Sequence, residues 1–291
     1  MDYKKKIITS LLLALVATVG LLLLNPERSS SESAKQYFWT NKTFNDHKYD
    51  IVAYGDSRVY RGFSTKHFLG NKNLTCFNFG YSSASFSERM LEFCASKLSD
   101  KKERKLIFGI TSHSFTDHAQ KDEQFVLEQS RSSFDILLRK YKAGSIKRFD
   151  PISPEDVFGF SKKVETFYSD GWVSTSKVEI DTAGGLESYK KVFEDNPVNA
   201  TAVNHFMKFV EHQVSLGVDV YAYRPPTMVS MDSLEDELSG FDFKSFKIQF
   251  ENAGGIWIDV PRSGYQTYDG SHLTLTSTIQ FSDWLGKQIL D

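Results

Sequence analysis

The chain has 291 residues, enough for one large domain or two small ones, and its apolar and charged fractions are those of an ordinary globular protein. The formal net charge is only −2, so the composition gives no case for binding nucleic acid. Aromatic residues make up 14% of the chain, mostly Phe and Tyr, and we expect them to form a Phe-rich core rather than a carbohydrate-stacking surface.

The N-terminus carries an export pattern. Three lysines at positions 4–6 precede an apolar run over residues 7–24, which is long enough to span a bilayer as a helix. The lysines predict a cytoplasmic N-terminus and an exported remainder, periplasmic or at the cell surface. We favour an uncleaved signal anchor in a single-pass membrane protein, because the run is long and no small-x-small cleavage site follows it. A cleaved signal peptide is the alternative.

The rest of the chain alternates between strand-like and helix-like segments. Residues 25–46 are predicted to be a polar stalk, and residues 47–291 one domain. Apolar runs predict strands at 51–54, 74–79, 105–110, 218–223 and 255–260, and helical spacing predicts helices at 85–98, 201–216, 243–252 and 273–290. This order predicts a three-layer α/β/α domain with a five-stranded parallel sheet.

A long insertion interrupts this alternation at residues 116–199. We expect it to be helical over 124–141 and to form a loop over 168–172. It is either a lid or wall beside the site or a peripheral elaboration, and both interpretations stay open.

Two short motifs carry the chemistry. Gly55-Asp56-Ser57 follows the first predicted strand, and Asp269-Gly270-Ser271-His272 lies just before the last predicted helix. A serine nucleophile needs a base that takes its proton, and the base needs a carboxylate that holds its tautomer. We therefore predict a triad in which Ser57 attacks an ester, His272 is the base and Asp269 orients it. Sites in parallel sheets lie beyond the carboxyl ends of the strands, where Ser57 is expected.

From about residue 50 to residue 290 the chain resembles the SGNH (GDSL-like) hydrolase superfamily. Gly55-Asp56-Ser57 is similar to the first block of that family, Asn78-Phe79-Gly80 to the second, and Asp269-x-x-His272 to the last. The resemblance implies a flavodoxin-like sheet, no Gly-x-Ser-x-Gly elbow, and an oxyanion hole that includes the backbone amides of Ser57 and Gly80.

The third block departs from the family pattern. The family has Gly-x-Asn after the third strand, where this chain has Gly109-Ile110-Thr111-Ser112. The hydroxyl of Thr111 or Ser112, or a backbone amide, would then replace the missing donor. Loss of one oxyanion donor costs about 3 kcal/mol in other enzymes, so this departure bears on catalytic efficiency.

The start Gly-Asp-Ser-Arg and the N-terminal apolar run are also similar to divergent, membrane-tethered bacterial SGNH-like proteins. Several of those move or remove acyl groups on envelope or exported polysaccharides. The resemblance implies an esterase or an O-acyltransferase that acts on acylated glycans, and we expect the acyl group to be acetyl. An O-acyltransferase would also need a membrane partner that supplies the acyl group. The alternative is a catalytically weak envelope protein that binds glycan or a membrane partner.

Three further side chains are weaker candidates for substrate binding. Arg58 would bind an acyl or anionic group of the substrate, but a surface residue or one that supports the site from behind is the favoured interpretation. Arg224 would meet a substrate carboxylate, and a structural salt bridge is the competing interpretation. His113 would line the site or be a solvated loop residue. We expect no cofactor, and the spacing of His and carboxylate residues supports no metal site.

Two cysteines, Cys76 and Cys94, fall in apolar segments. An exported protein permits a disulfide between them, but we expect free buried thiols.

Overall fold

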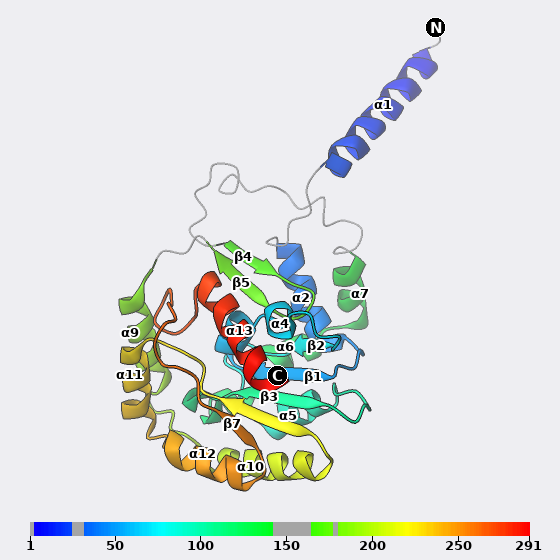
Figure 1. Ribbon diagram of the computed structural model, residues 1–291. Helices are drawn as coiled ribbons and strands as arrows, with labels where there is room; N and C mark the ends of the chain where they lie inside the picture. Colours follow the sequence, from blue (N-terminus) through cyan, green and yellow to red (C-terminus); the bar gives the residue numbers. More distant parts are fainter. Residues whose placement is uncertain (1–2, 25–31, 142–163, 177–179) are drawn as a thin grey trace.

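A five-stranded parallel sheet forms the centre of the computed structural model, which describes residues 3–24, 32–141, 164–176 and 180–291. The strands are β1 (Ile51–Gly55), β2 (Cys76–Asn78), β3 (Lys105–Gly109), β6 (Asp219–Tyr223) and β7 (Ile256–Ile258), in the order β2-β1-β3-β6-β7 (Figure 1). After β1 the chain forms β2 at one edge of the sheet, and it then crosses back to form β3 on the other side of β1. This places a topological switch between the carboxyl ends of β1 and β3, where such sheets bind ligands.

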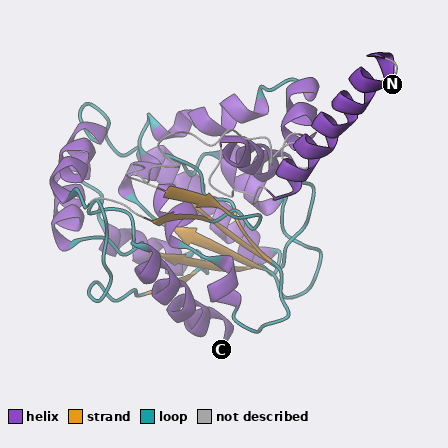
Figure 2. Cartoon of the chain, turned by 90° about the horizontal axis from the view of Figure 1, so that it is seen from above, coloured by secondary structure: helices purple, strands orange, loops and turns teal. Residues whose placement is uncertain are grey.

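Helices cover both faces of the sheet, as Figure 2 shows from above. One face carries α3 (Ser57–Gly62), α4 (Thr65–Leu69) and α13 (Leu275–Leu290), and the other carries α5 (Glu88–Ala95), α10 (Ala200–Ser215) and α12 (Phe243–Asn252). Alternate β1 side chains enter the two cores, since Ile51 packs on the α13 side and Val52 on the α10 side. The predicted three-layer α/β domain with a five-stranded parallel sheet is confirmed.

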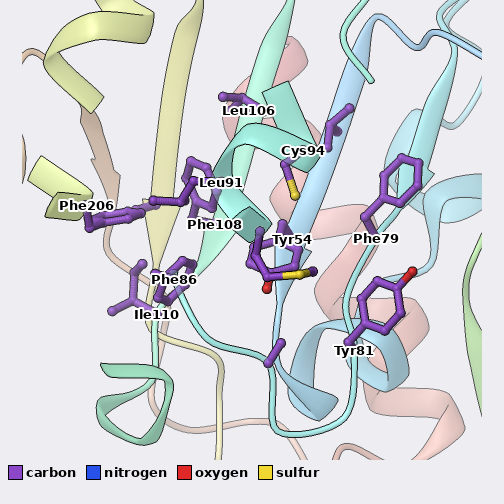
Figure 3. Packing of buried hydrophobic residues seen from close by; sticks show 14 of the residues in the cluster. Tyr54, Phe79, Tyr81, Phe86, Leu91, Cys94, Leu106, Phe108, Ile110 and Phe206 are labelled. Atoms are coloured by element: carbon purple, nitrogen blue, oxygen red, sulfur yellow. The ribbon is translucent and has the colours of Figure 1, made fainter. Parts of the chain in front are cut away.

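The larger core is rich in Phe, as expected from the composition. Tyr54, Phe86, Phe108 and Phe206 lie in contact beneath α5 and α10 (Figure 3). Phe86 and Phe206 have ring centroids 4.8 Å apart. The Phe side chains here are thus used for burial between sheet and helices.

Both cysteines are buried and free, which confirms the expectation of unpaired thiols. Cys76 belongs to the core on the α13 side, and Cys94 belongs to the core on the α10 side. The sheet therefore separates them.

The predicted stalk is wrong for residues 32–44, which form helix α2 (Glu32–Phe44) packed on the domain. Phe38 and Trp39 are buried, and Lys42 is fully buried with its Nζ donating to the carbonyls of Gly80 (2.7 Å) and Gly171 (2.8 Å). The sequence looked polar because the apolar part of α2 is a short aromatic patch and one buried position is a lysine. Hydrogen bonds to carbonyls and four surrounding aromatic rings offset the burial of that lysine.

The N-terminal apolar run lies within helix α1 (Tyr3–Leu24), and its large side chains from Ile7 to Val16 are exposed. The three lysines belong to the first turns of this helix, so one of its ends is charged. In the part of the chain that the structure describes, no helix combines the length and the apolar character needed to cross a membrane. The predicted transmembrane span is therefore not supported.

The insertion contributes several elements around the sheet. They are η1 (Ser112–Phe115), η2 (Ala119–Lys121), α6 (Glu123–Gln129), α7 (Ser133–Tyr141), the antiparallel pair β4 (Val164–Phe167) and β5 (Val173–Ser176), and α9 (Thr182–Val192). The helix predicted over 124–141 is two helices, and the loop predicted over 168–172 is the β4–β5 turn. Residues 142–163 and 177–179 of the insertion lie outside the described residues. Helix α11 (Val229–Ser239), beyond the insertion, was not predicted.

Candidate active site

Ser57 is the first residue of α3, directly beyond the carboxyl end of β1. Asp56 caps this helix, since its Oδ1 accepts a hydrogen bond from the Arg58 amide (2.9 Å), and its Oδ2 accepts one from the Thr111 hydroxyl (2.9 Å). Thr111 follows β3, the neighbour of β1 in the sheet. The buried Asp56 carboxylate therefore joins the loops at the two sides of the topological switch and holds Ser57 there.

Two glycines let α3 approach the sheet closely. A Cβ atom on Gly55 would lie 2.5 Å from Val59 Cγ2, and one on Gly109 would lie 2.3 Å from the same atom. Real Cβ atoms do not come so close, so any larger residue at either position would push α3 away. The glycines of the first and third blocks are therefore required by packing under the nucleophile.

The predicted acid and base lie on one loop, residues 268–274, which we call the acid–base loop. Asp269 Oδ1 accepts hydrogen bonds from the backbone amides of Ser271 (3.0 Å) and His272 (2.7 Å). Gly270 has φ = +84°, a conformation that glycine adopts readily. The carboxylate thus folds its own loop and leaves Oδ2 to face the imidazole.

The three predicted triad residues meet at hydrogen-bond distance. His272 Nδ1 lies 2.7 Å from Asp269 Oδ2, and His272 Nε2 lies 2.8 Å from Ser57 Oγ. A proton on Nδ1 that is donated to the carboxylate leaves Nε2 as an acceptor for the serine O–H. This geometry is the one that general-base activation of a serine requires.

Asp269 is held ionised. Burial favours its neutral form, but the hydrogen bond and charge of His272 and the two backbone amides outweigh burial and lower the pKa of Asp269 to about 2. At neutral pH the carboxylate therefore carries the charge that stabilises a protonated His272.

One aromatic residue at the site was missed by the sequence analysis. The ring of Tyr268 stacks on the His272 ring, with centroids 5.7 Å apart and planes at 16°, and Tyr268 is buried. The sequence signal that could have identified Tyr268 is its position directly before the Asp-x-x-His motif. The stack restricts rotation of the imidazole about χ2.

Arg58 does not point to substrate, which corrects the prediction. Its guanidinium is buried and donates to Ser271 Oγ (2.8 Å) and to both carboxylate oxygens of Glu235 on α11. Because its guanidinium is buried and paired with Glu235, Arg58 is not exposed to an incoming ligand. The sequence could not show this, because Glu235 lies 177 positions away.

Of the four predicted oxyanion donors, two are engaged in other hydrogen bonds and two have no acceptor among the described residues. The Gly80 amide donates to Asn78 Oδ1 (2.9 Å), and the single hydroxyl proton of Thr111 goes to Asp56, so neither predicted donor is free to meet an oxyanion in this structure. The Ser57 amide has no hydrogen-bond acceptor among the described residues, because it is the first N–H of α3. The Ser112 hydroxyl is buried and likewise has no partner in the described part of the chain.

Arg224 is also a structural residue rather than a substrate ligand. It pairs with Asp232 (3.3 Å) and Asp236 (2.8 Å) on α11, and its guanidinium lies 3.9 Å from the Phe243 ring centroid. The ion pair that competed with the ligand interpretation is the one observed.

His113 remains a candidate ligand. It is 8% exposed and lines a cleft of about 440 Å³ together with His118 and Lys191, at the carboxyl end of β3. Burial lowers the pKa of His113 and outweighs the Asp56 carboxylate, which favours the charged form. A neutral imidazole at this position can donate and accept hydrogen bonds.

Two segments of the insertion support the site. A Cβ atom on Gly185 of α9 would lie 1.9 Å from the Asp269 carbonyl oxygen, so α9 packs directly on the acid–base loop. Arg61 of α3 donates to Thr175 of β5 (2.9 Å), and its carbonyl accepts the Trp172 indole N–H (3.0 Å). The insertion therefore packs against both α3, which carries Ser57, and the acid–base loop.

Within the described residues no group of three His, Cys, Asp or Glu side chains could hold a metal ion.

Comparison with known proteins gives little beyond this geometry. No protein-family model matches the chain, and no curated protein matches it. Among solved structures, a Streptococcus pneumonia protein provisionally described as a platelet activating factor matches over 94% of this chain and 98% of its own, with 11% identity and a TM-score of 0.39. Est24, a carbohydrate acetylesterase from Sinorhizobium meliloti, matches over 82% of this chain and 97% of its own, with 10% identity and a TM-score of 0.38. Similarities this weak do not bear on the chemistry of the site.

Proposed function

We propose that the protein is a serine-dependent acyl enzyme, a divergent member of the SGNH-like hydrolases that cleaves or transfers acyl esters. The observation that carries this proposal is the continuous chain of hydrogen bonds from Ser57 Oγ through His272 to Asp269, at 2.8 and 2.7 Å. Such a chain of nucleophile, base and carboxylate is the arrangement that serine acyl transfer uses on unrelated folds.

The reaction proceeds in two halves. Ser57 Oγ forms a bond to the ester carbonyl carbon while its proton moves to His272 Nε2, and the Ser57 amide donates to the oxyanion. Collapse breaks the bond to the leaving alcohol, which takes the proton from His272 and leaves an acyl-serine. Water or a sugar hydroxyl then attacks the acyl-serine, again giving its proton to His272. The bond between the acyl carbon and Ser57 Oγ breaks, Ser57 Oγ takes the proton back from His272, and a carboxylic acid or a new ester is released.

We propose an acylated glycan as the substrate, with acetyl as the acyl group. The support is the family resemblance of the motifs Gly55-Asp56-Ser57 and Asp269-x-x-His272. Acetyl release from an acetylated polysaccharide and acetyl transfer to an unacetylated one, measured in parallel, separate an esterase from an O-acyltransferase. A transferase would need an acyl donor, which a membrane partner is proposed to supply.

The deciding experiment is covalent labelling with a fluorophosphonate, which reacts with activated serines. We expect the wild type and the control variant Ser282→Ala to be labelled and Ser57→Ala not to be. Ser282 is a buried serine in α13 with two hydrogen bonds, so its loss tests general disturbance of the fold. Labelling of Ser57→Ala equal to that of wild type would refute the proposal.

A second candidate function is an envelope protein that binds glycan with little or no turnover. It is favoured by the engagement of the Gly80 amide and the Thr111 hydroxyl, which leaves only two of the four predicted oxyanion donors, the Ser57 amide and the Ser112 hydroxyl, without an acceptor among the described residues. Binding of unmodified polysaccharide by calorimetry, with no labelling of the wild type, would select this function.

We also propose that the domain is exported, supported by the lysines at positions 4–6 and the apolar run that follows them. Fractionation of cells that express the full chain tests this, and N-terminal sequencing of the exported protein tells a retained segment from a cleaved signal. A native protein that begins after residue 25 would show cleavage. A full-length protein recovered in the cytoplasm would refute export.

A further inference from the structure

A buried polar network joins the residue after the nucleophile to the residue before the base. Arg58 Nε donates to Ser271 Oγ (2.8 Å), and Ser271 Oγ donates to the Tyr189 hydroxyl (2.6 Å). The other nitrogens of Arg58 bind the Glu235 carboxylate, and its guanidinium lies 5.1 Å from the Tyr189 ring centroid. Arg58, Ser271 and Glu235 are between 0% and 4% exposed, so water does not compete for these bonds.

The network runs parallel to the contact between nucleophile and base. Ser57 meets His272, and the next residue along α3, Arg58, meets the preceding residue of the acid–base loop, Ser271. Two adjacent contacts between the same two segments prevent one from sliding or rotating against the other. A single contact at hydrogen-bond length would leave that freedom.

Each member of the network has at least one hydrogen-bond partner within it. The Ser271 hydroxyl accepts one hydrogen bond and donates one, and the Arg58 charge is balanced by Glu235. Fully satisfied polar networks in a low-dielectric interior are rigid, whereas partly satisfied ones are not. Tyr189 belongs to α9 and Glu235 to α11, so the network also ties two peripheral helices to the site.

We propose that Arg58, Ser271 and Tyr189 are positioning residues that hold the His272 ring at hydrogen-bond distance from Ser57 Oγ. The proposal rests on the serine chemistry proposed above. Ser271→Ala and Tyr189→Phe are its best tests, because each removes one hydroxyl and leaves the Arg58–Glu235 pair in place. Ser282→Ala is the matched control, since Ser282 is equally buried and also accepts one hydrogen bond and donates one.

The first readout is the rate of fluorophosphonate labelling at a reagent concentration below saturation. A displacement of about 1 Å at a catalytic group costs on the order of 100-fold in rate, so we expect Ser271→Ala to lower the labelling rate about 10- to 100-fold. Tyr189→Phe should give a smaller loss, because Ser271 keeps its bond to Arg58. Ester hydrolysis should show the loss in kcat with KM unchanged.

A merely structural role predicts a different pattern. Ser271→Ala and Ser282→Ala would then lower the melting temperature by similar amounts and leave the labelling rate of the folded protein unchanged. Labelling of Ser271→Ala within twofold of the wild-type rate, in a folded protein, overturns the proposal.

A second readout does not need activity. The proton that His272 Nδ1 shares with Asp269 should give a far-downfield proton NMR resonance, which His272→Ala would remove and so assign. We expect the resonance in wild type and Ser282→Ala, and its broadening or loss in Ser271→Ala. If the wild type is not labelled, the serine-enzyme function fails, and this resonance alone decides on the positioning. Its absence from wild type, or its persistence unchanged in Ser271→Ala, overturns the positioning role.

Discussion

Substitution of Asp269 by Asn separates the two tasks of this carboxylate. The amide oxygen of Asn can still accept hydrogen bonds from the Ser271 and His272 amides, so the acid–base loop keeps its fold. The amide NH₂ group, however, would face His272 Nδ1, which must then be an acceptor. The imidazole proton moves to Nε2 and points at Ser57 Oγ, so His272 no longer accepts the serine proton. We expect kcat to fall about 10⁴-fold with KM unchanged.

The same substitution has a modest and pH-dependent effect on stability. The pKa of Asp269 is lowered from 3.8 to about 2 in the folded protein. This difference of about 1.8 corresponds to about 2.4 kcal/mol in favour of the ionised form. Because 27% of the side chain is exposed, solvent screening reduces the contribution to about 1–2 kcal/mol. A lowered carboxyl pKa stabilises the fold above pH of about 4, and this stabilisation disappears as the pH falls from about 4 to about 2.

Ester hydrolysis at pH 7 and urea unfolding at pH 7, 4, 3 and 2 test both halves of this reasoning. The free energy of unfolding of wild type should exceed that of Asp269→Asn by about 1–2 kcal/mol at pH 7, and the gap should close toward pH 2. Turnover of the variant within tenfold of wild type would show that His272 does not depend on this carboxylate. A stability gap that is constant with pH would show that the ionised form of Asp269 is not favoured by folding.

Three further sets of substitutions test the triad and its supports. Ser57→Ala and His272→Ala should each abolish nearly all turnover, and the double variant should be little worse than either, because the two groups act as one unit; steady-state kinetics measures this. Glu235→Gln should destabilise the protein by about 3–5 kcal/mol in urea unfolding, since it leaves a buried guanidinium uncompensated, whereas Arg58→Met combined with Glu235→Leu should recover most of that loss. Gly185→Ala should cost about 1–3 kcal/mol and slow acylation, because its methyl group would displace a carbonyl of the acid–base loop. A Gly185→Ala protein with wild-type melting temperature and turnover would contradict that packing.

The central fold was predictable because the elements that build it have strong local patterns. All five strands of the parallel sheet were found, since buried parallel strands appear as short apolar runs such as 105–109. Helices α10 and α13 were found because their apolar side chains recur at helical spacing. The boundaries of these elements differed from the predicted ones by at most three residues, as is usual where helix and strand ends fray.

Two helices that the sequence did not reveal, α2 and α11, each bury a charged side chain beside apolar ones. Helix α11 buries Glu235 and α2 buries Lys42, and neither residue looks like a core residue in a local window. Each is stabilised by a partner distant in sequence, Arg58 in one case and the Gly80 carbonyl in the other. The periodicity of apolar residues cannot predict a buried position when its burial depends on a partner distant in the sequence.

In the candidate site, too, some features could be predicted from the sequence and others could not. The meeting of Ser57, His272 and Asp269 was predictable because these residue types and the order of their motifs are specific. The oxyanion donors were not, because a hydroxyl in a sequence appears free until its acceptor is known. Thr111 looked available as a donor, but its proton is taken by Asp56, 55 positions earlier.

The neighbours of Ser57 show what the short first motif specifies. Asp56 binds the loop after β3, and Arg58 binds the acid–base loop and α11, so the nucleophile lies between two charged side chains anchored in opposite directions. Both side chains are at least 96% buried, and burial of a charge is costly even when it is paired. Apolar replacement of a buried ion pair such as Arg58–Glu235 is often neutral or stabilising. The cost is therefore best explained by the position that these anchors give to Ser57 between Thr111 and Ser271.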